Sequence, residues 1–172
     1  WFRFSPYCPE PETRQKFMVK GVTFAMKMQV LYVQKKEGVQ DNPEITATKI
    51  ARDYKCKSDK IPPAYPCEKE RLVILCFEHY GSLDKRLLAF CQDLSTDRAS
   101  NVALIIMNKD GSDAVPEQLA AIFKQNGVAV AGVCGLAVKK GLFSAGKLTD
   151  ANIKAASDFA DAKITALFDS VG

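Results

Sequence analysis

Four short apolar runs, separated by longer segments with helical periodicity, constrain the fold of this chain more than any other feature. They cover residues 28–34, 71–77, 101–108 and 127–134. Each run is too short for a helix and too uniformly apolar for a strand with one solvent-facing side, which predicts strands buried on both faces. Strands that alternate with helices form a parallel sheet with helices on both sides. The sequence therefore predicts an α/β fold.

The segments between the runs contain residues that commonly begin helices. We expect helix starts at Asn42, at Ser82 with Asp84, at Asp113 shortly before Pro116 and Glu117, and at Thr149. Side-chain oxygens of these residue types accept hydrogen bonds from the free amide groups of a first helical turn. Gly127 follows the apolar stripe of the third helical segment and can adopt the positive φ that ends a helix.

The segment between the first helix and the second apolar run is unusually short. Residues 55–70 contain three prolines, which oppose both helix formation and regular strand pairing. We expect a short edge strand near residues 58–61 and no helix after it. At 172 residues the chain has the length of one domain, which we assign to residues 28–172. Residues 1–27 are expected to form an arm that packs on the domain or docks a partner, with residues 22–25 extending the first strand.

Cysteine usage and hydropathy restrict the cellular setting. Cys76, Cys91 and Cys134 lie inside apolar runs, as reduced and buried cysteines do, and this predicts a cytoplasmic protein. Cys56 and Cys67 are expected to be solvated loop cysteines, and their spacing without a CxxC motif or a histidine partner supports no metal site. No secretory leader or membrane-spanning stretch is evident, so no membrane is expected as a partner.

The net charge of +4 is concentrated in the first part of the chain. Residues 1–60 hold twelve Lys or Arg against seven Asp or Glu. An excess of this size suits an acidic partner or an anionic ligand. It lacks the dense basic stripe of nucleic-acid-binding proteins, so no nucleic acid is expected as a partner.

Ligands of open parallel sheets bind beside the carboxyl ends of the strands, so the loops after the four runs form the candidate site. The loop after the second run reads FEHYGS and places two aromatic residues, the only histidine and a glycine where a flat ring would bind. The loop after the third run begins at Asn108. Lys35, Lys36 and Gly38 follow the first run and lead to a helix start that can hold an anion. His79 either faces a ligand or is structural, and the two lysines are either anion ligands or solvated.

These loops and runs resemble the flavodoxin-like family. The stretch from Leu72 to Leu94, followed by NVALIIMNKDGS and NGVAVAGVCG, is similar to the middle and C-terminal parts of these proteins. Leu87 and Phe90 match a Leu-x-x-Phe signature of the family. The resemblance covers roughly residues 28–172 and implies a three-layer α/β/α sandwich of about five strands in the order 2-1-3-4-5, with a shortened second βα unit. It also implies FMN as a non-covalently bound cofactor.

Carried over by position, the resemblance assigns the flavin ring to the loop after the second run, with Tyr80 at the position of the stacking aromatic residue. Asn108 falls near a second loop that approaches the ring or the protein partner. The resemblance implies no catalytic residue. The cofactor-binding residues that it implies, together with the lysine-bearing loop, are Lys35, Lys36, Gly38, Phe77, Glu78, His79, Tyr80, Gly81 and Asn108.

Two departures from the family pattern concern charge. The family binds the FMN phosphate with a hydroxyl-rich loop of the type T-x-T-G-N-T, whereas residues 34–42 read QKKEGVQDN and contain no hydroxyl. Glu37 and Asp41 offset the positive charge of the neighbouring lysines, which argues against tight FMN binding. Glu78 stands where the family often has proline, and a carboxylate beside the ring disfavours the anionic reduced flavin.

Three functions are compatible with these residues. The first is a flavodoxin-like redox protein that holds a flavin and exchanges electrons with a redox partner protein. The second is a cofactor-free adaptor or subunit of a larger oxidoreductase, which the missing phosphate loop favours. The third is a small flavin-dependent reductase that binds substrate over the ring. We expect the first, an electron-transfer or accessory protein rather than an enzyme by itself.

Overall fold

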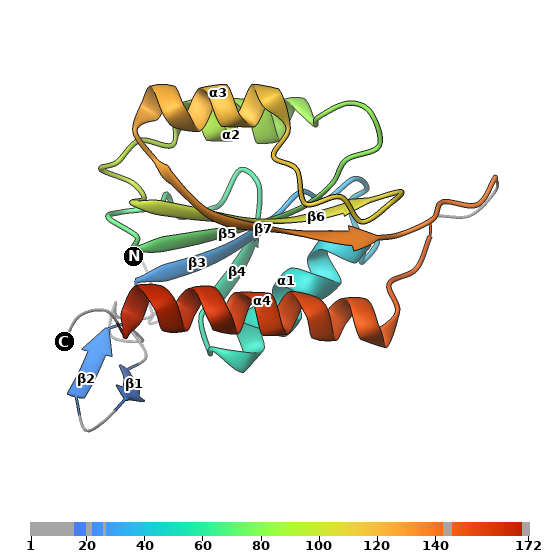
Figure 1. Cartoon of the computed structure of the whole chain (residues 1–172). Helices are drawn as coiled ribbons and strands as arrows, with labels where there is room; N and C mark the ends of the chain where they lie inside the picture. Colours follow the sequence, from blue (N-terminus) through green and yellow to red (C-terminus); the bar gives the residue numbers. More distant parts are fainter. Residues whose placement is uncertain (1–15, 20–21, 26, 143–145, 170–172) are drawn as a thin grey trace, which may run out of the picture.

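A five-stranded parallel sheet between two layers of helices forms the main body of the computed structural model, which describes residues 16–19, 22–25, 27–142 and 146–169 (Figure 1). The strands, in spatial order, are β4 (Lys57–Lys60), β3 (Met28–Tyr32), β5 (Leu72–Glu78), β6 (Asn101–Asn108) and β7 (Ala129–Ala137). When only the five strands of this sheet are numbered in chain order, β3 is the first and β4 the second, and the spatial order is the predicted 2-1-3-4-5. The α/β architecture expected from the apolar runs is therefore confirmed.

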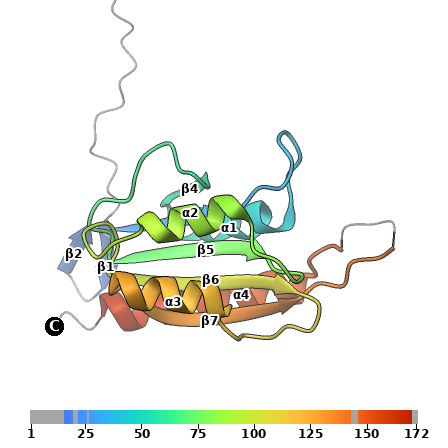
Figure 2. The same ribbon diagram turned by 90° about the horizontal axis from the view of Figure 1, so that it is seen from above.

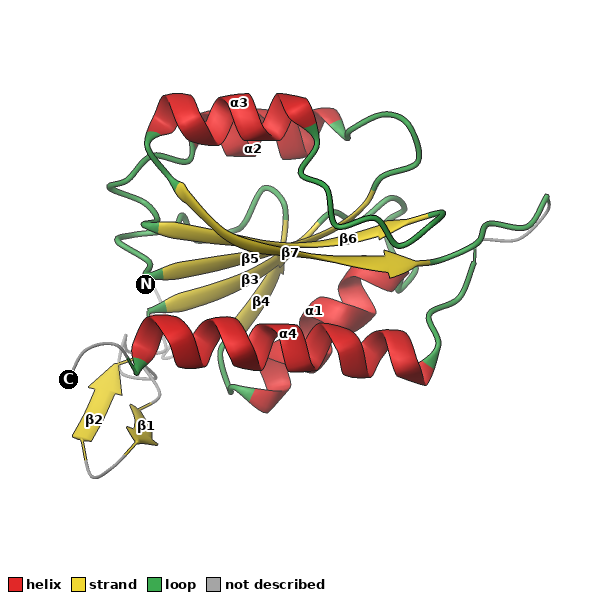
Figure 3. Cartoon of the chain, viewed as in Figure 1, coloured by secondary structure: helices red, strands yellow, loops and turns green. Residues whose placement is uncertain are grey.

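Two helices cover each face of the sheet (Figures 1 and 3). α1 (Asn42–Asp53) and α4 (Asp150–Phe168) lie on one face, and α2 (Lys85–Asp93) and α3 (Glu117–Asn126) lie on the other. Seen from above, α2 and α3 run side by side (Figure 2). Residues 61–71, between β4 and β5, form no helix, as the shortened second βα unit predicts. None of the described helices is long and apolar enough to cross a membrane.

The two faces of the sheet bury alternate side chains of the same strand. On β5, Leu75 and Phe77 pack under α2 and α3, whereas Ile74 and Cys76 pack against α1 and α4. Every residue from Leu72 to Phe77 is at most 1% exposed, which explains why this strand reads as an uninterrupted apolar run. Each buried Leu or Ile of this kind stabilises the fold by about 1.5–3 kcal/mol.

The residues ahead of β3 differ from expectation. β1 (Lys16–Val19) and β2 (Val22–Ala25) form a separate antiparallel pair, so residues 22–25 do not extend the first strand of the main sheet. These residues have the β propensity that the sequence indicated, but they pair with the segment next to them in the chain. Residues 1–15 of the expected arm lie outside the described residues.

The starts of α4 and α1 lie at or beside their predicted residues, and a proline accounts for the shifted cap of α1. Thr149 caps α4 as predicted, because its side-chain oxygen accepts a hydrogen bond from the amide of Asn152 at 3.2 Å. The cap of α1 is Asp41 and not Asn42. Pro43 explains the difference, because it lacks an amide hydrogen and is tolerated in the first turn, which places the capping residue ahead of Asn42.

The other two helices, α2 and α3, begin after Ser82 and Asp113 respectively. Of the predicted pair Ser82 and Asp84, it is Asp84 that caps α2, and it accepts a hydrogen bond from the amide of Arg86 at 2.8 Å. Pro116, not Asp113, precedes α3, and no side chain caps this helix. The first turn of α3 therefore keeps amide groups that no capping side chain satisfies.

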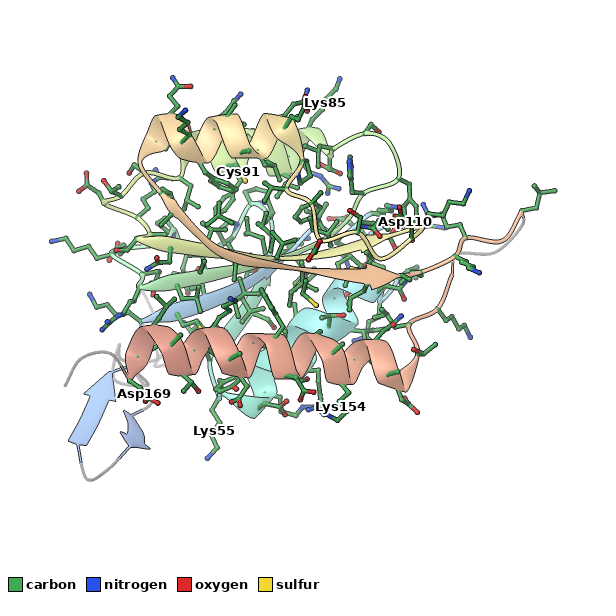
Figure 4. All side chains as sticks on the ribbon, viewed as in Figure 1. Lys55, Lys85, Cys91, Asp110, Lys154 and Asp169 are labelled. Atoms are coloured by element: carbon green, nitrogen blue, oxygen red, sulfur yellow. The ribbon has the colours of Figure 1, made fainter. Side chains whose placement is uncertain are left out.

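Two cysteines lie deeper than the sequence suggested. Cys67 is 3% exposed and packs in the core on the α2 side, and Cys56 is partly buried on the α1 side, so neither is a solvated loop residue. Cys91 lies between α2 and the sheet (Figure 4). Burial raises the pKa of the Cys56, Cys67 and Cys91 thiols to about 12. These thiols are therefore poor nucleophiles at neutral pH.

Candidate functional site at the carboxyl ends of the strands

The loops that follow β3, β5, β6 and β7 meet at one edge of the sheet, beyond the arrowheads in Figure 1. Between the loops after β5 and β6 the surface is hollowed into an open pocket of about 540 Å³. His79, Tyr80 and Gly81 line it from one side, and residues between 108 and 117 line it from the other. A pocket of this size lies in the range that small-molecule ligands occupy.

Asn108, the last residue of β6, fixes the loop that forms one wall of the pocket. Its side-chain amide donates to the carbonyl oxygen of Ser112 at 2.7 Å, and its side-chain oxygen accepts a hydrogen bond from the amide of Gly111 at 2.6 Å. Gly111 has a φ of +74°, a conformation that favours glycine. Since Asn108 is only 8% exposed, its contribution is to shape the loop after β6.

His79 begins the loop after β5. Its backbone amide donates to the carbonyl oxygen of Met107 at 2.9 Å, which fixes the start of this loop against β6. The residue lines the pocket, and its Nδ1 is buried without a hydrogen-bond partner among the described residues. A buried polar atom left in this state costs about 1–3 kcal/mol. The Nδ1 atom of His79 is therefore left unsatisfied by the described residues around it.

Glu78, the last residue of β5, is the centre of a charged cluster. Its side chain is only 6% exposed, and its carboxylate pairs with the ammonium groups of Lys35 and Lys140, the latter at 3.7 Å. Burial opposes the charge of Lys35, but its contacts with Glu78 and Lys140 outweigh burial and raise the pKa of Lys35. The contact with Lys35, followed by burial, lowers the pKa of Lys140. The buried Glu78 carboxylate is thus shared by Lys35 and Lys140.

Tyr80 reaches from the end of β5 to the segment after β7. Its hydroxyl donates to the carbonyl oxygen of Val138 at 2.8 Å. The Nζ atoms of Lys140 and Lys35 lie 4.0 Å and 5.5 Å from the centre of its ring, within cation–π range. Burial, followed by the nearby Glu78 carboxylate, raises the pKa of Tyr80, so the hydroxyl keeps its proton. Contacts within the protein therefore hold the ring in place.

The start of α1 is closed by a carboxylate of the chain itself. Asp41 accepts hydrogen bonds from the backbone amides of Glu44 at 3.2 Å and Lys35 at 2.9 Å. Pro43 has no amide hydrogen to offer. The side-chain amide of Asn42 donates to the carbonyl oxygen of residue 146 at 2.7 Å and lies 3.4 Å from Glu78 Oε1. These donors, which would bind an anion at a helix start, are engaged within the protein.

The predicted site residues fall into four groups. Lys35 and Glu78 join the charged cluster, and the pocket-lining residues are His79, Tyr80, Gly81 and Asn108. Phe77 differs, because it is 1% exposed and packs in the core under α2 and α3, where it has no surface for a ligand. Lys36 and Gly38 are exposed on the turn after β3 and do not line the pocket.

Three residues of the site were not among the predicted binding residues. Lys140 follows β7, so the rule that strand ends carry the site pointed to its loop. Asn42 was interpreted only as a helix start, although its side chain reaches the Glu78 carboxylate. Asp41 was considered only for its charge, and its position directly before the Asn-Pro pair was the available signal for a cap.

Comparison with solved structures identifies a similar architecture. A structure titled as a flavodoxin of Streptococcus pneumoniae TIGR4 matches 81% of this chain and 98% of its own, with a TM-score of 0.56 and 14% sequence identity. The chain has a flavodoxin-like fold. At this identity the likeness shows the fold alone. No family model and no curated protein matches the chain.

The flavodoxin-like fold implies FMN, and the two ends of that molecule fit this edge differently. The pocket, with the unpartnered Nδ1 of His79, fits a flat ring. The start of α1 does not fit a phosphate, because the Asp41 carboxylate already accepts the amides of Glu44 and Lys35 and because the nearest lysines share the Glu78 carboxylate. The described residues therefore do not fit FMN as a whole.

Proposed function

We propose that this protein binds a flavin-type ring non-covalently between the loops after β5 and β6 and exchanges electrons with a partner protein. The observation that carries the proposal is the open pocket of about 540 Å³ at the ends of two central strands, lined by His79 with its buried, unpartnered Nδ1. The architecture shared with a flavodoxin supports the same position for a ligand. The ring would supply the redox chemistry, and the protein would bind and orient it.

Two backbone features of the pocket suit a flat ring with carbonyl groups. Gly81 has a φ of +113°, and the space where its side chain would be is open. α3 begins at the pocket, where Pro116 and Glu117 line the wall and no side chain caps the first turn. The amide groups of that turn can donate hydrogen bonds to a carbonyl oxygen of the ring.

A second candidate function, a cofactor-free subunit or adaptor of a larger oxidoreductase, is favoured by a different observation. Asp41 caps α1, and Tyr80 is bonded to Val138, so this part of the edge is satisfied without a ligand. In that case the same loops would contact a partner protein directly. Ligand binding to the purified chain separates the two functions.

The experiment is a titration of the purified full chain with riboflavin, followed by quenching of flavin fluorescence and by the shift in Tm. We expect saturable quenching and a rise in Tm, because a ligand that binds the folded state stabilises it. Ala114→Trp fills the pocket from an exposed loop position and should abolish quenching. Ala155→Trp, on the exposed side of α4, is the matched control and should bind normally. A chain that shows neither quenching nor a Tm shift supports the adaptor.

A further inference from the structure

We infer that the pocket selects a ring ligand that carries no phosphate, and that Asp41 is the residue that sets this selectivity. The inference rests on the proposed flavin-type binding and names the form of the ligand as an uncharged flavin such as riboflavin. It follows from three features of the edge: the charges around α1, the charges of the pocket and the position of Tyr80.

Four of the basic groups around the start of α1 are already paired with carboxylates, and Lys36 is exposed on the turn beside them. The pairs are Lys35 and Lys140 with Glu78, Arg86 with Asp84 at 2.9 Å, and Lys60 with Glu37 at 3.2 Å. Arg86 also donates to the backbone carbonyl of Gln34 at 2.6 Å. A phosphate would have to compete with one of these carboxylates to gain any of the four paired cations.

Asp41 adds a direct obstacle at the helix start itself. Its two carboxylate oxygens accept one backbone amide each, from Glu44 and from Lys35. An incoming phosphate would compete for the same two donors and would meet a negative charge at hydrogen-bond range. Asp41 thus occupies the position of the anion that a helix start attracts.

The pocket itself carries more negative than positive charge. Among the residues that line it, Asp110 and Glu117 are acidic and Lys109 is basic. Asp110 lies at the edge of the sheet where the carboxyl ends of the strands meet (Figure 4). An uncharged ring enters such a pocket without electrostatic cost, whereas a phosphate dianion near it is repelled.

Tyr80 contacts both the pocket and the charged cluster beside α1. It lines the pocket, its ring contacts the ammonium group of Lys35, and its hydroxyl is bonded to Val138. Asp41 does not line the pocket, so a phosphate on a ligand whose ring lies there would have to extend beyond the pocket to reach the start of α1. A shorter, uncharged side chain has no such requirement.

The test compares riboflavin and FMN in separate fluorescence-quenching titrations of the full chain. We expect riboflavin to bind at least about tenfold more tightly than FMN at low ionic strength, and the ratio to shrink as salt screens the repulsion. Asp41→Ser removes the charge and retains a capping side chain, so it should improve FMN affinity by about tenfold and change riboflavin affinity by less than about twofold.

Asp53→Ser is the matched control, because it makes the same change of charge at the opposite end of α1. It should leave the ratio of the two affinities unchanged, and circular dichroism should show that both variants are folded. FMN binding as tightly as riboflavin, or an unchanged ratio in Asp41→Ser, would overturn the selectivity and leave the proposed function standing. Failure of both flavins to bind would overturn the proposed function and this inference together.

Discussion

Gly135 on β7 lies directly against the backbone carbonyl of Ser112, with no room for a side chain between them. This contact lays the loop after β6 across the neighbouring edge strand. Because Ser112 lines the pocket, Gly135 helps to set the shape of the pocket wall. The importance of this glycine lies in close packing, since a positive φ is not involved.

Replacing Gly135 by alanine should therefore destabilise the protein. A Cβ at this position would overlap the carbonyl oxygens of Gly111 and Ser112, and backbone atoms cannot move aside cheaply. We expect a loss of about 2–3 kcal/mol in the free energy of unfolding, measured by urea denaturation. Gly132→Ala in the same strand is the control. Its Cβ would meet chiefly the flexible end of Lys163, so it should cost less. Equal stability of the two variants would contradict this account.

Tyr80→Phe should loosen the segment after β7. The substitution removes the hydrogen bond to the Val138 carbonyl and leaves the ring in place. We expect a loss of about 0.5–1.5 kcal/mol in stability, together with faster hydrogen exchange of the backbone amides near residues 138–142. Tyr65→Phe, at a tyrosine that is 66% exposed, should change neither quantity. Unchanged exchange in Tyr80→Phe would show that the hydroxyl does not hold this segment.

Lys140 should react with acylating reagents faster than its neighbour Lys139. Its pKa is lowered, first by the contact with Lys35, so a larger fraction of the amine is unprotonated at pH 8. In Lys35→Met the pKa of Lys140 should rise, and its acylation should slow severalfold. Peptide mass spectrometry after limited acetylation measures both rates, with Lys139 as the internal reference. The same Lys140 rate in both proteins would sink the electrostatic explanation.

The buried thiols predict a loss of stability at alkaline pH. Burial raises the pKa of Cys56, Cys67 and Cys91 from 9.0 to about 12, so between these values the unfolded chain releases protons that the folded chain keeps. The free energy of unfolding should therefore be highest below pH 9 and fall as the pH rises toward 12. Urea denaturation under reducing conditions measures the slope. Cys56→Ala removes one contribution and should flatten it; an identical slope would contradict the assignment.

The parallel sheet and the edge that carries the candidate site could be predicted from local patterns, and the strand order was predicted from the resemblance to flavodoxin-like proteins. An uninterrupted apolar run such as Leu72–Phe77 marks a central strand, and the topology then fixes where the loops meet. Phe77 was misplaced because the sequence did not decide whether the last residue of the apolar run belongs to the strand or to the ligand-binding loop, and the structure continues β5 to Glu78. This extra residue makes Phe77 a strand residue whose side chain faces the core.

The charged cluster could not be predicted, because its members are far apart in the chain. Lys35, Glu78 and Lys140 follow or end three different strands, and each residue alone is an ordinary surface charge. Only the folded sheet shows that one carboxylate is shared by two lysines. The capping role of Asp41 could have been predicted, because an acidic residue before Asn42-Pro43 matches the pattern of a capped helix.

The Asp41 cap also bears on how this protein matures in a cell. A fold that leaves a helix end open for a ligand gains stability when that ligand arrives, so its persistence depends on nutrient supply. Here the first turn of α1 is completed as soon as the chain folds. Newly made copies can therefore reach full stability at this end before any ligand is bound, and the supply of a ligand should not alter their lifetime through this helix.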